Sequence, residues 1–144
     1  MKKHLAVVLC LSLCGCFTPW TYTQDGAQTQ GEKAIKVICQ SEHNHSVFNG
    51  LDHRLYILDI DGTQTPKANE LLYPESAYVA PGRHEVEIQS ATSFSVATGR
   101  VWFVAEAGKS YMIHQTPQGN GVVFWTEELG TGKVVGGPIE NKRP

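Results

Sequence analysis

His84-Glu85-Val86-Glu87-Ile88 carries the clearest structural signal in this 144-residue chain. Its histidine, valine and isoleucine occupy every second position, and two glutamates stand between them. This two-residue period is that of a strand with one face in a core and the other in water. A sheet with one solvated face is usually antiparallel. The segment therefore predicts an antiparallel sheet, with Val86 in the core and His84 as a core residue whose ring is hydrogen-bonded.

Further strand patterns extend outward from this segment in both directions. His53–Ile60 is a near-continuous apolar run of strand length, and Ala34–Gln40 places Ile35, Val37 and Cys39 on one face. Downstream, strands are predicted at Arg100–Glu106, Ser110–Gln115, Val122–Glu127 and Lys133–Val135, with turn signals at Asp61-Gly62, Ala107–Lys109, Pro117–Asn120 and Gly130–Gly132. About seven short strands with little helix predict an all-β fold, a small antiparallel β-sandwich.

Two finer predictions accompany this fold. Val104 is expected to face the core with Val86, so that an aspartate at either position would be severely destabilising. Thr65–Leu72 has a capping threonine followed by Pro66, which favours one or two helical turns before Pro74.

The composition divides the chain into four parts. Residues 1–15 form an export signal, and residues 16–31, rich in Thr, Gln and Gly, are predicted to be a flexible tether. Residues 32–136 form one β domain, which is long enough to bury a core. Residues 137–144 form a polar tail.

The amino end has the pattern of bacterial export. Lys2-Lys3 is basic, Leu5–Leu13 is an apolar run too short to cross a bilayer, and Leu13-Cys14-Gly15-Cys16 follows. This arrangement resembles the lipobox of bacterial lipoproteins, which implies cleavage before Cys16 and lipid on that cysteine. In that family an aspartate after the cysteine favours inner-membrane retention, so Phe17 implies the outer membrane, with the periplasmic or surface face left open. An ordinary cleaved signal with a coincidental cysteine is the alternative.

The net charge and the cysteine content limit the kinds of partner and of disulfide that the mature chain can have. The formal net charge of −2 becomes −4 when the two lysines of the signal are removed, which excludes a basic surface for nucleic acid. Cys10 and Cys14 leave with the signal and Cys16 takes lipid, so Cys39 has no disulfide partner. Cys39 is therefore predicted to be a small buried apolar side chain.

Two motifs resemble the PEGA-like surface β-domains. They are Ile60-Asp61-Gly62 followed by Thr65-Pro66, and Pro81-Gly82 followed by His84-x-Val86-x-Ile88. The match covers about a quarter of the chain and departs from the pattern in the segment Lys67–Tyr78. The resemblance implies a non-catalytic β-sandwich used for display or contact.

Cys39, His43, His45 and His53 form the best candidate for chemistry. A thiolate and imidazoles can bind zinc or copper, and the His43-x-His45 spacing puts both rings on one side of an extended segment. No second cysteine or acidic ligand completes a common spacing. A buried Cys39 with solvated histidines is the competing interpretation, and it is the one preferred.

Two tryptophans are candidates for contact with a partner. Trp102-Phe103 and Phe124-Trp125 place aromatic rings on both faces of two strands, so one ring of each pair faces outward. Outward Trp102 and Trp125 can contact a protein or stack on a glycan. Coverage of these rings by residues Phe17–Gly31 of the tether or by the long loop is the competing interpretation, and it is the one preferred.

Catalytic patterns are weak in this sequence. Asp59 and Asp61 share one face of a strand, but Asp61 before Gly62 is explained by turn formation. No serine lies in a nucleophile elbow, and neither glycine-rich turn has the lysine of a phosphate loop. We therefore expect no enzyme and no cofactor. The prediction is an outer-membrane lipoprotein that acts as a non-catalytic interaction or structural module, with a metal- or ligand-binding lipoprotein as the alternative.

Overall fold

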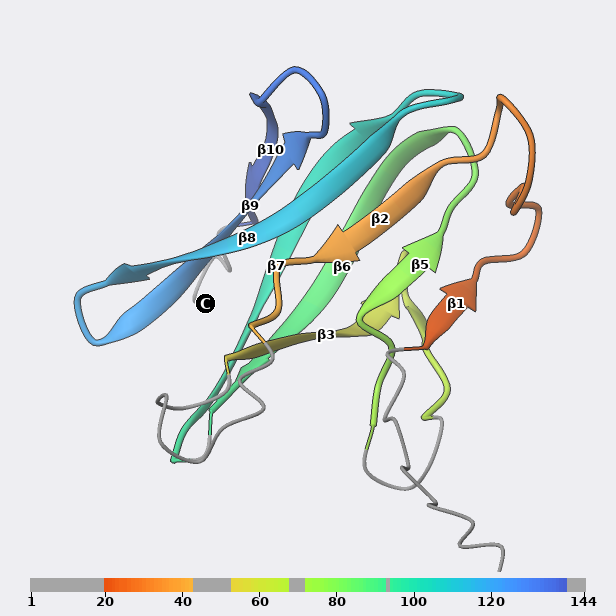
Figure 1. Cartoon of the computed structure of the whole chain (residues 1–144). Coiled ribbons are helices and arrows are strands. Elements are labelled where there is room, and N and C mark those ends of the chain that lie inside the picture. Colours follow the sequence, from red (N-terminus) through yellow and green to blue (C-terminus); the bar gives the residue numbers. More distant parts are fainter. Residues whose placement is uncertain (1–19, 43–52, 68–71, 93, 140–144) are drawn as a thin grey trace, which may run out of the picture.

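The computed structural model describes residues 20–42, 53–67, 72–92 and 94–139, and these ranges contain strands, turns and coil but no helix (Figure 1). The all-β prediction is therefore confirmed, and these ranges hold no helix of the length and hydropathy needed to span a membrane. The strands are β1 (Thr21–Thr23), β2 (Lys36–Cys39), β3 (Arg54–Ile60), β4 (Thr63–Gln64), β5 (Ser76–Tyr78), β6 (Gly82–Ala91), β7 (Val96–Ala105), β8 (Ser110–Gln118), β9 (Gly121–Glu128) and β10 (Lys133–Pro138).

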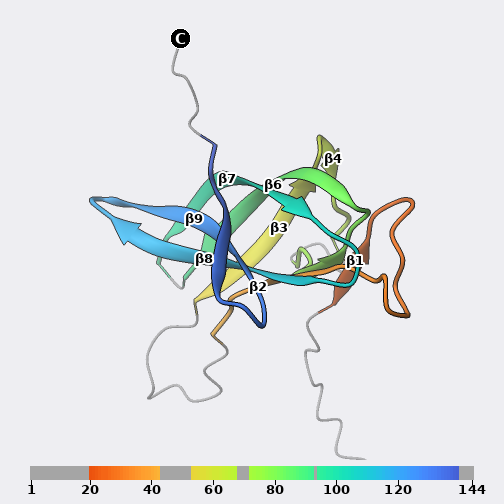
Figure 2. The ribbon, with the colours of Figure 1, turned by 90° about the horizontal axis from the view of Figure 1, so that it is seen from above.

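All ten strands belong to one sheet, in the order β1-β5-β2-β8-β9-β10-β7-β6-β3-β4. The β1–β5 and β2–β8 pairs are parallel, and the other neighbours are antiparallel. The sheet curls into a half-barrel, as the view from above shows (Figure 2).

The predicted sandwich of about seven strands is therefore wrong. A sandwich has two separate sheets, whereas β10 pairs with β9 on one side and with β7 on the other, which joins the two halves. Residues on the inside of a curled sheet alternate with outward residues just as those of a sandwich do. The sequence pattern consequently shows which residues face a core, but not whether one sheet or two surround it.

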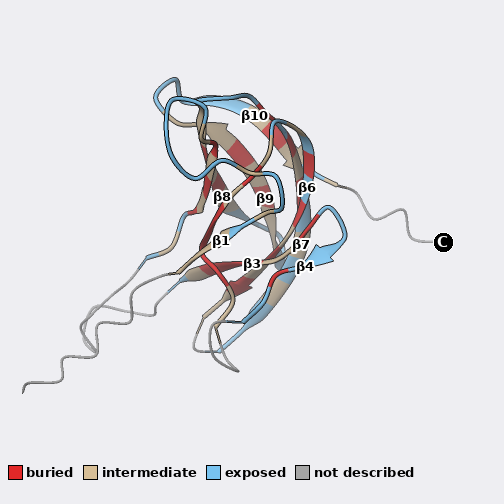
Figure 3. Cartoon of the chain, turned by 90° about the vertical axis from the view of Figure 1, so that its right-hand side faces the viewer, coloured by how far each residue is buried: buried red, intermediate tan, exposed pale blue. Residues whose placement is uncertain are grey.

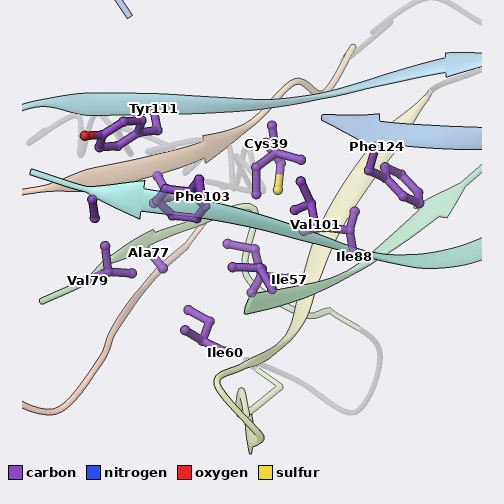
Figure 4. Packing of buried hydrophobic residues seen from close by; sticks show 14 of the residues in the cluster. Cys39, Ile57, Ile60, Ala77, Val79, Ile88, Val101, Phe103, Tyr111 and Phe124 are labelled. Carbon is purple, nitrogen blue, oxygen red and sulfur yellow. The ribbon is translucent and has the colours of Figure 1, made fainter. Parts of the chain in front are cut away.

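The core fills the inside of the curled sheet (Figure 4). Val86 and Ile88 on β6 are fully buried, as the alternating segment predicts. The ring of Phe103 lies between those of Tyr111 and His84, with centroids 5.2 and 5.7 Å away. Ile35, Val37 and Cys39 are also buried on one face, which confirms that prediction. The other members of the cluster are Leu55, Ile57, Ile60, Ala77, Val79, Val101, Ala105, Ile113 and Phe124.

Two glycines permit close approaches inside the curl. A Cβ on Gly99 would lie 2.8 Å from the ring of Phe124, which is closer than real Cβ contacts. A Cβ on Gly136 would collide with the carbonyl oxygen of Trp102. Glycine at these positions therefore lets β7 approach both the core ring of β9 and the backbone of β10.

β7 confirms the predicted strand but reverses one expected side chain. Val101, Phe103 and Ala105 are buried, whereas Val104 is 48% exposed. The prediction that Val104 faces the core is wrong. Apolar residues occupy consecutive positions from Val101 to Ala105, so the two-residue period alone fits either face. The antiparallel pairing of Phe103 with His84 determines which face is buried.

Residues 20–24 of the predicted tether contact the domain, so the prediction of a free segment does not hold for these residues. Trp20 donates its indole Nε1–H to the carbonyl of Leu72 at 3.2 Å, and β1 pairs with β5. The amide of Gln24 donates to Asp61 at 2.9 Å, and its Oε1 accepts from the backbone N–H of Ala80 at 3.2 Å. Polar composition favours solvation, but these side chains are satisfied equally well by the sheet.

The carboxyl end also extends further than predicted. β10 includes Gly137 and Pro138, and the N–H of Ile139 donates to the carbonyl of Arg100 at 2.9 Å. The predicted polar tail therefore starts too early, and residues 140–144 lie outside the described ranges. Thr65–Lys67 is not helical, and the hydroxyl of Thr65 donates to the carbonyl of Ile57 at 2.6 Å. The rest of the predicted helical turn includes residues 68–71, which are also outside those ranges.

Candidate functional site

An open groove of about 530 Å³ crosses the outer face of the sheet between β7 and β10. Trp102, Val104 and Val134 give it apolar walls, and charged side chains stand at one end. Val104 and Val134 are 48% and 60% exposed, although valine is one of the residue types most often found fully buried. Figure 3 colours the chain by burial, and β7 and β10 each combine buried residues with intermediate and exposed ones.

The strands create this groove by alternation and by missing side chains. On β7, Trp102 and Val104 point outward because Val101, Phe103 and Ala105 point into the core. On β10, Gly137 stands opposite Trp102, and a Cβ there would meet no atom within 4 Å. The glycine thus leaves open space beside the indole, where any other residue would project a side chain.

The charged end of the groove is nearly balanced. Lys109 lies between Glu106 and Glu128, with its Nζ 2.7 and 3.0 Å from their carboxylate oxygens. The hydrogen bond from Lys109 lowers the pKa of the Glu106 carboxyl. Lys133 lines the groove as well. The end therefore offers hydrogen-bonding groups of both signs rather than a strong field of one sign.

The face of the Trp102 ring is already engaged. The guanidinium of Arg83 lies 5.0 Å from the ring centroid, which is a cation–π distance. Arg83 is also paired with Glu85 at 3.1 Å. The predicted outward orientation of Trp102 is consistent with this position. The described part of the predicted tether does not bond to Trp102, because its hydrogen bonds go to residues such as Leu72 and Ala80.

The second predicted aromatic contact, Trp125, lies on the same outer face through β8 and β9. Its ring stacks on the imidazole of His114, with centroids 4.2 Å apart and planes at 13°. Its Nε1–H donates to the hydroxyl of Thr116 at 3.0 Å. His114 also contacts Gln40 through Nδ1 at 2.7 Å. Trp125 is therefore held within a local cluster and does not line the groove of Trp102.

The candidate metal ligands are only partly described. Cys39 points into the core, where burial raises the pKa of its thiol, and Figure 4 shows its sulfur among apolar side chains. His53 is exposed on the surface and forms a backbone bridge with Glu42. His43 and His45 lie outside the described ranges. Within those ranges, no three His, Cys, Asp or Glu side chains are grouped as a metal would require.

Asp61 accepts hydrogen bonds from several residues, and the sequence indicates only its role in the turn. Its Oδ2 is 2.7 Å from Nδ1 of His84 and accepts from Gln24, and its Oδ1 accepts from the backbone N–H of Glu85 at 2.8 Å. Partial burial acts to raise the pKa of Asp61, but these hydrogen bonds outweigh it and lower the pKa.

The same cluster explains His84 and Asp59. Nε2 of buried His84 lies 2.7 Å from the carbonyl of Ala80, which confirms the predicted core histidine with a hydrogen-bonded ring. Asp59 accepts from the N–H of Gly62 at 2.7 Å. Asp61 and Gly62 have φ values of 55° and 82°, as a tight hairpin turn requires. Both carboxylates therefore serve the turn and its surroundings.

Comparison with family models, with curated proteins and with solved structures found no match for this chain.

The groove contains residues that sequence reasoning missed. Trp102 was predicted to face outward, but Val104 was assigned to the core, and Val134 was placed in a strand with no assigned face. The available signal was Gly136-Gly137, because a glycine pair inside a strand marks close backbone approach or an absent side chain.

Proposed function

We propose that this protein is an outer-membrane lipoprotein, held by lipid on Cys16, whose β domain is a non-catalytic contact module of the cell envelope. The groove of Trp102, Val104 and Val134 is the observation that carries the proposal. It combines exposed apolar side chains with charged groups at its end, which is the composition of a contact surface with an apolar centre and a polar rim.

Contact through the face of the sheet is favoured over contact through its edges. The two outer strands of the sheet are β1 with three residues and β4 with two. Very short edge strands present few unpaired backbone groups and so resist the addition of another strand. A partner therefore gains more from the groove than from either edge.

The surroundings of the tryptophans favour a protein partner over a glycan. A sugar ring stacks on an open aromatic face, but Arg83 lies over the ring of Trp102 and His114 stacks on Trp125. The charged side chains of the groove are at its end, whereas Val104 and Val134 beside Trp102 offer apolar area without hydrogen-bonding groups for sugar hydroxyls. A short apolar segment of another envelope protein fits this surface better.

The metal-binding alternative is weakened by the position of Cys39. A thiol that binds zinc must lose its proton, and burial in an apolar cluster opposes that loss. His53 lies on the surface, whereas Cys39 faces the core. We therefore do not retain a site that depends on both residues.

Site-specific photo-crosslinking in intact membranes tests the contact surface. A photoreactive amino acid at Val134 should give a discrete adduct of higher mass, and one at exposed Thr63 on β4 is the matched control. Adding Val104→Asp should remove the adduct, because a carboxylate in the groove opposes apolar contact. Protease treatment distinguishes a protein adduct from a glycan adduct. Equal labelling at both positions, or none at Val134, would contradict the proposal.

A further inference from the structure

The tip of the β6–β7 hairpin carries two strongly exposed apolar side chains. Phe94 is 85% and Val96 is 64% exposed. The turn that presents them is held by Thr92, whose hydroxyl accepts from the N–H groups of Phe94 and Ser95 at 3.3 and 3.0 Å. The N–H of Thr92 donates to the carbonyl of Ser95 at 2.9 Å. These hydrogen bonds tie the backbone of Phe94 and Ser95 to Thr92 at the end of β6.

The hairpin tip is also free of charge. No Asp, Glu, Lys or Arg occurs between Glu87 and Arg100, and the small side chains there are Ser, Thr, Ala and Gly. Further along β6 the outward positions are charged, as Arg83, Glu85 and Glu87 show. Apolar side chains in an uncharged surround lower their free energy by entering the boundary between lipid headgroups and acyl chains.

Strand register puts this tip at the same end of the sheet as the beginning of β1. Thr21 stands opposite Ser76, and the pairing can be followed across the sheet to Val96, which starts β7 opposite Ala91. Figure 1 shows the start of β1 and the β6–β7 tip toward the lower side of the molecule. The loop between β9 and β10, which contains Thr131, lies at the opposite end.

The length of chain before β1 brings this end to the membrane. Trp20 is bonded to the domain through its indole, and it follows Cys16 by four residues. Four extended residues reach at most roughly 14 Å. With lipid on Cys16, as in the proposed function on which this step rests, the domain is held with its β1 end against the bilayer. The β6–β7 tip faces the same surface.

We infer that Phe94 and Val96 insert into the lipid interface as a second, non-covalent membrane contact. Two contacts at separate points fix the orientation of the domain, whereas the lipid alone leaves it free to rotate about its attachment. In this orientation the β9–β10 loop points away from the membrane, and the groove on the outer face of β7 and β10 stays accessible to a protein.

Depth-dependent quenching on the full acylated protein tests the inference. The protein is reconstituted in phosphatidylethanolamine–phosphatidylglycerol vesicles, some containing lipid with a quencher in the acyl chain. An environment-sensitive dye is attached at Ser95→Cys or, as the control, at Thr131→Cys at the far end. The remaining thiol, Cys39, is buried and does not compete for the dye. The dye at position 95 should be quenched several-fold more than the dye at position 131.

Removal of the two side chains supplies the second comparison. Phe94→Ser combined with Val96→Ser should abolish the excess quenching at position 95, and both positions are exposed enough to leave the fold intact. Vesicle flotation of each sample reports the anchor independently. Equal quenching at 95 and 131 in protein that floats would overturn this inference and leave the lipid anchor standing. Protein that does not float overturns both.

Discussion

Asp61→Asn should destabilise the domain more than Asp59→Asn, the equivalent isosteric change at the other carboxylate of the hairpin turn. Asparagine tolerates the positive φ of this position almost as well as aspartate does, so the substitution tests the side chain and not the backbone. The carboxylate accepts three hydrogen bonds, from Gln24, His84 and the amide of Glu85. An asparagine side chain has one oxygen that can accept hydrogen bonds. Its NH2 group replaces the second oxygen and is itself a donor, so it cannot accept the hydrogen bonds that this oxygen received.

The size of this destabilisation follows from the hydrogen-bond donors that lose their acceptor when Asp61 is replaced. The ring of His84 is buried, and its Nε2 already faces the carbonyl of Ala80 at 2.7 Å, so Nδ1 has Asp61 as its partner in the cluster. Loss of a charged acceptor costs about 2 to 3 kcal/mol when one donor stays buried without a partner. For a domain of this size that cost lowers the melting temperature by about 10 °C.

The pH dependence of stability provides an independent test of the role of Asp61. The pKa of Asp61 lies below its usual value of 3.8 in the folded protein, so its contribution to stability is fully present above that value. The contribution falls as pH drops through the folded pKa, where the carboxyl gains its proton. The stability difference between wild type and Asp61→Asn should therefore be constant near neutral pH and shrink in acid.

Thermal unfolding followed by circular dichroism measures this effect. Asp59→Asn is the matched control, because the oxygen of asparagine can still accept from the N–H of Gly62. The control should lower the melting temperature by about 3 °C or less, in line with less than 1 kcal/mol. If both variants melt together at neutral pH, Asp61 is not the centre of the cluster and the reasoning fails.

Three further predictions concern the sheet, the anchor and the metal question. Val86→Asp should unfold the domain in urea titrations, because burial of an unpaired carboxylate costs several kcal/mol, whereas Val104→Asp should cost less than about 1 kcal/mol; similar losses would refute the assigned faces of the sheet. Cys16→Ser should abolish fatty-acid labelling and release the protein from membranes after a high-salt wash without changing its spectrum, and a variant that still sediments would place the anchor elsewhere. Stoichiometric zinc should shift the unfolding free energy by less than about 1 kcal/mol, and one-to-one binding in calorimetry that is lost in His43→Ala/His45→Ala would contradict this.

The sequence predicted local structure well where a single face was apolar. The pattern around Val86 and the positions of Ile35 and Val37 were right, because alternation with polar residues leaves one orientation. β7 failed at Val104 because apolar side chains occupy both faces of that strand. The number of sheets failed for a different reason: the pairing of β10 with both β7 and β9 is a long-range choice that no local pattern encodes.

The candidate site was predictable only in part. The adjacent aromatic pair predicted that one of its two rings would face outward, and the structure shows that this ring is Trp102, because Phe103 is buried. The groove beside it depends on the irregular register of β10 between Val134 and Gly136, and a bulge of this kind depends on both neighbouring strands. The Asp61–His84 contact joins residues far apart in the chain, and the sequence indicated only that His84 would find some partner.

The attachment of β1 has a mechanical consequence. If Cys16 carries the anchor, any pull between membrane and domain is transmitted through Trp20 and the three paired residues of β1 before it reaches the core. Release of that segment as far as Ile35 would lengthen the connection from roughly 14 Å to roughly 65 Å. The same residues can hold the domain close to the membrane at rest and let it move further away under load. The half-barrel formed by the strands after Ile35 keeps its shape in both cases.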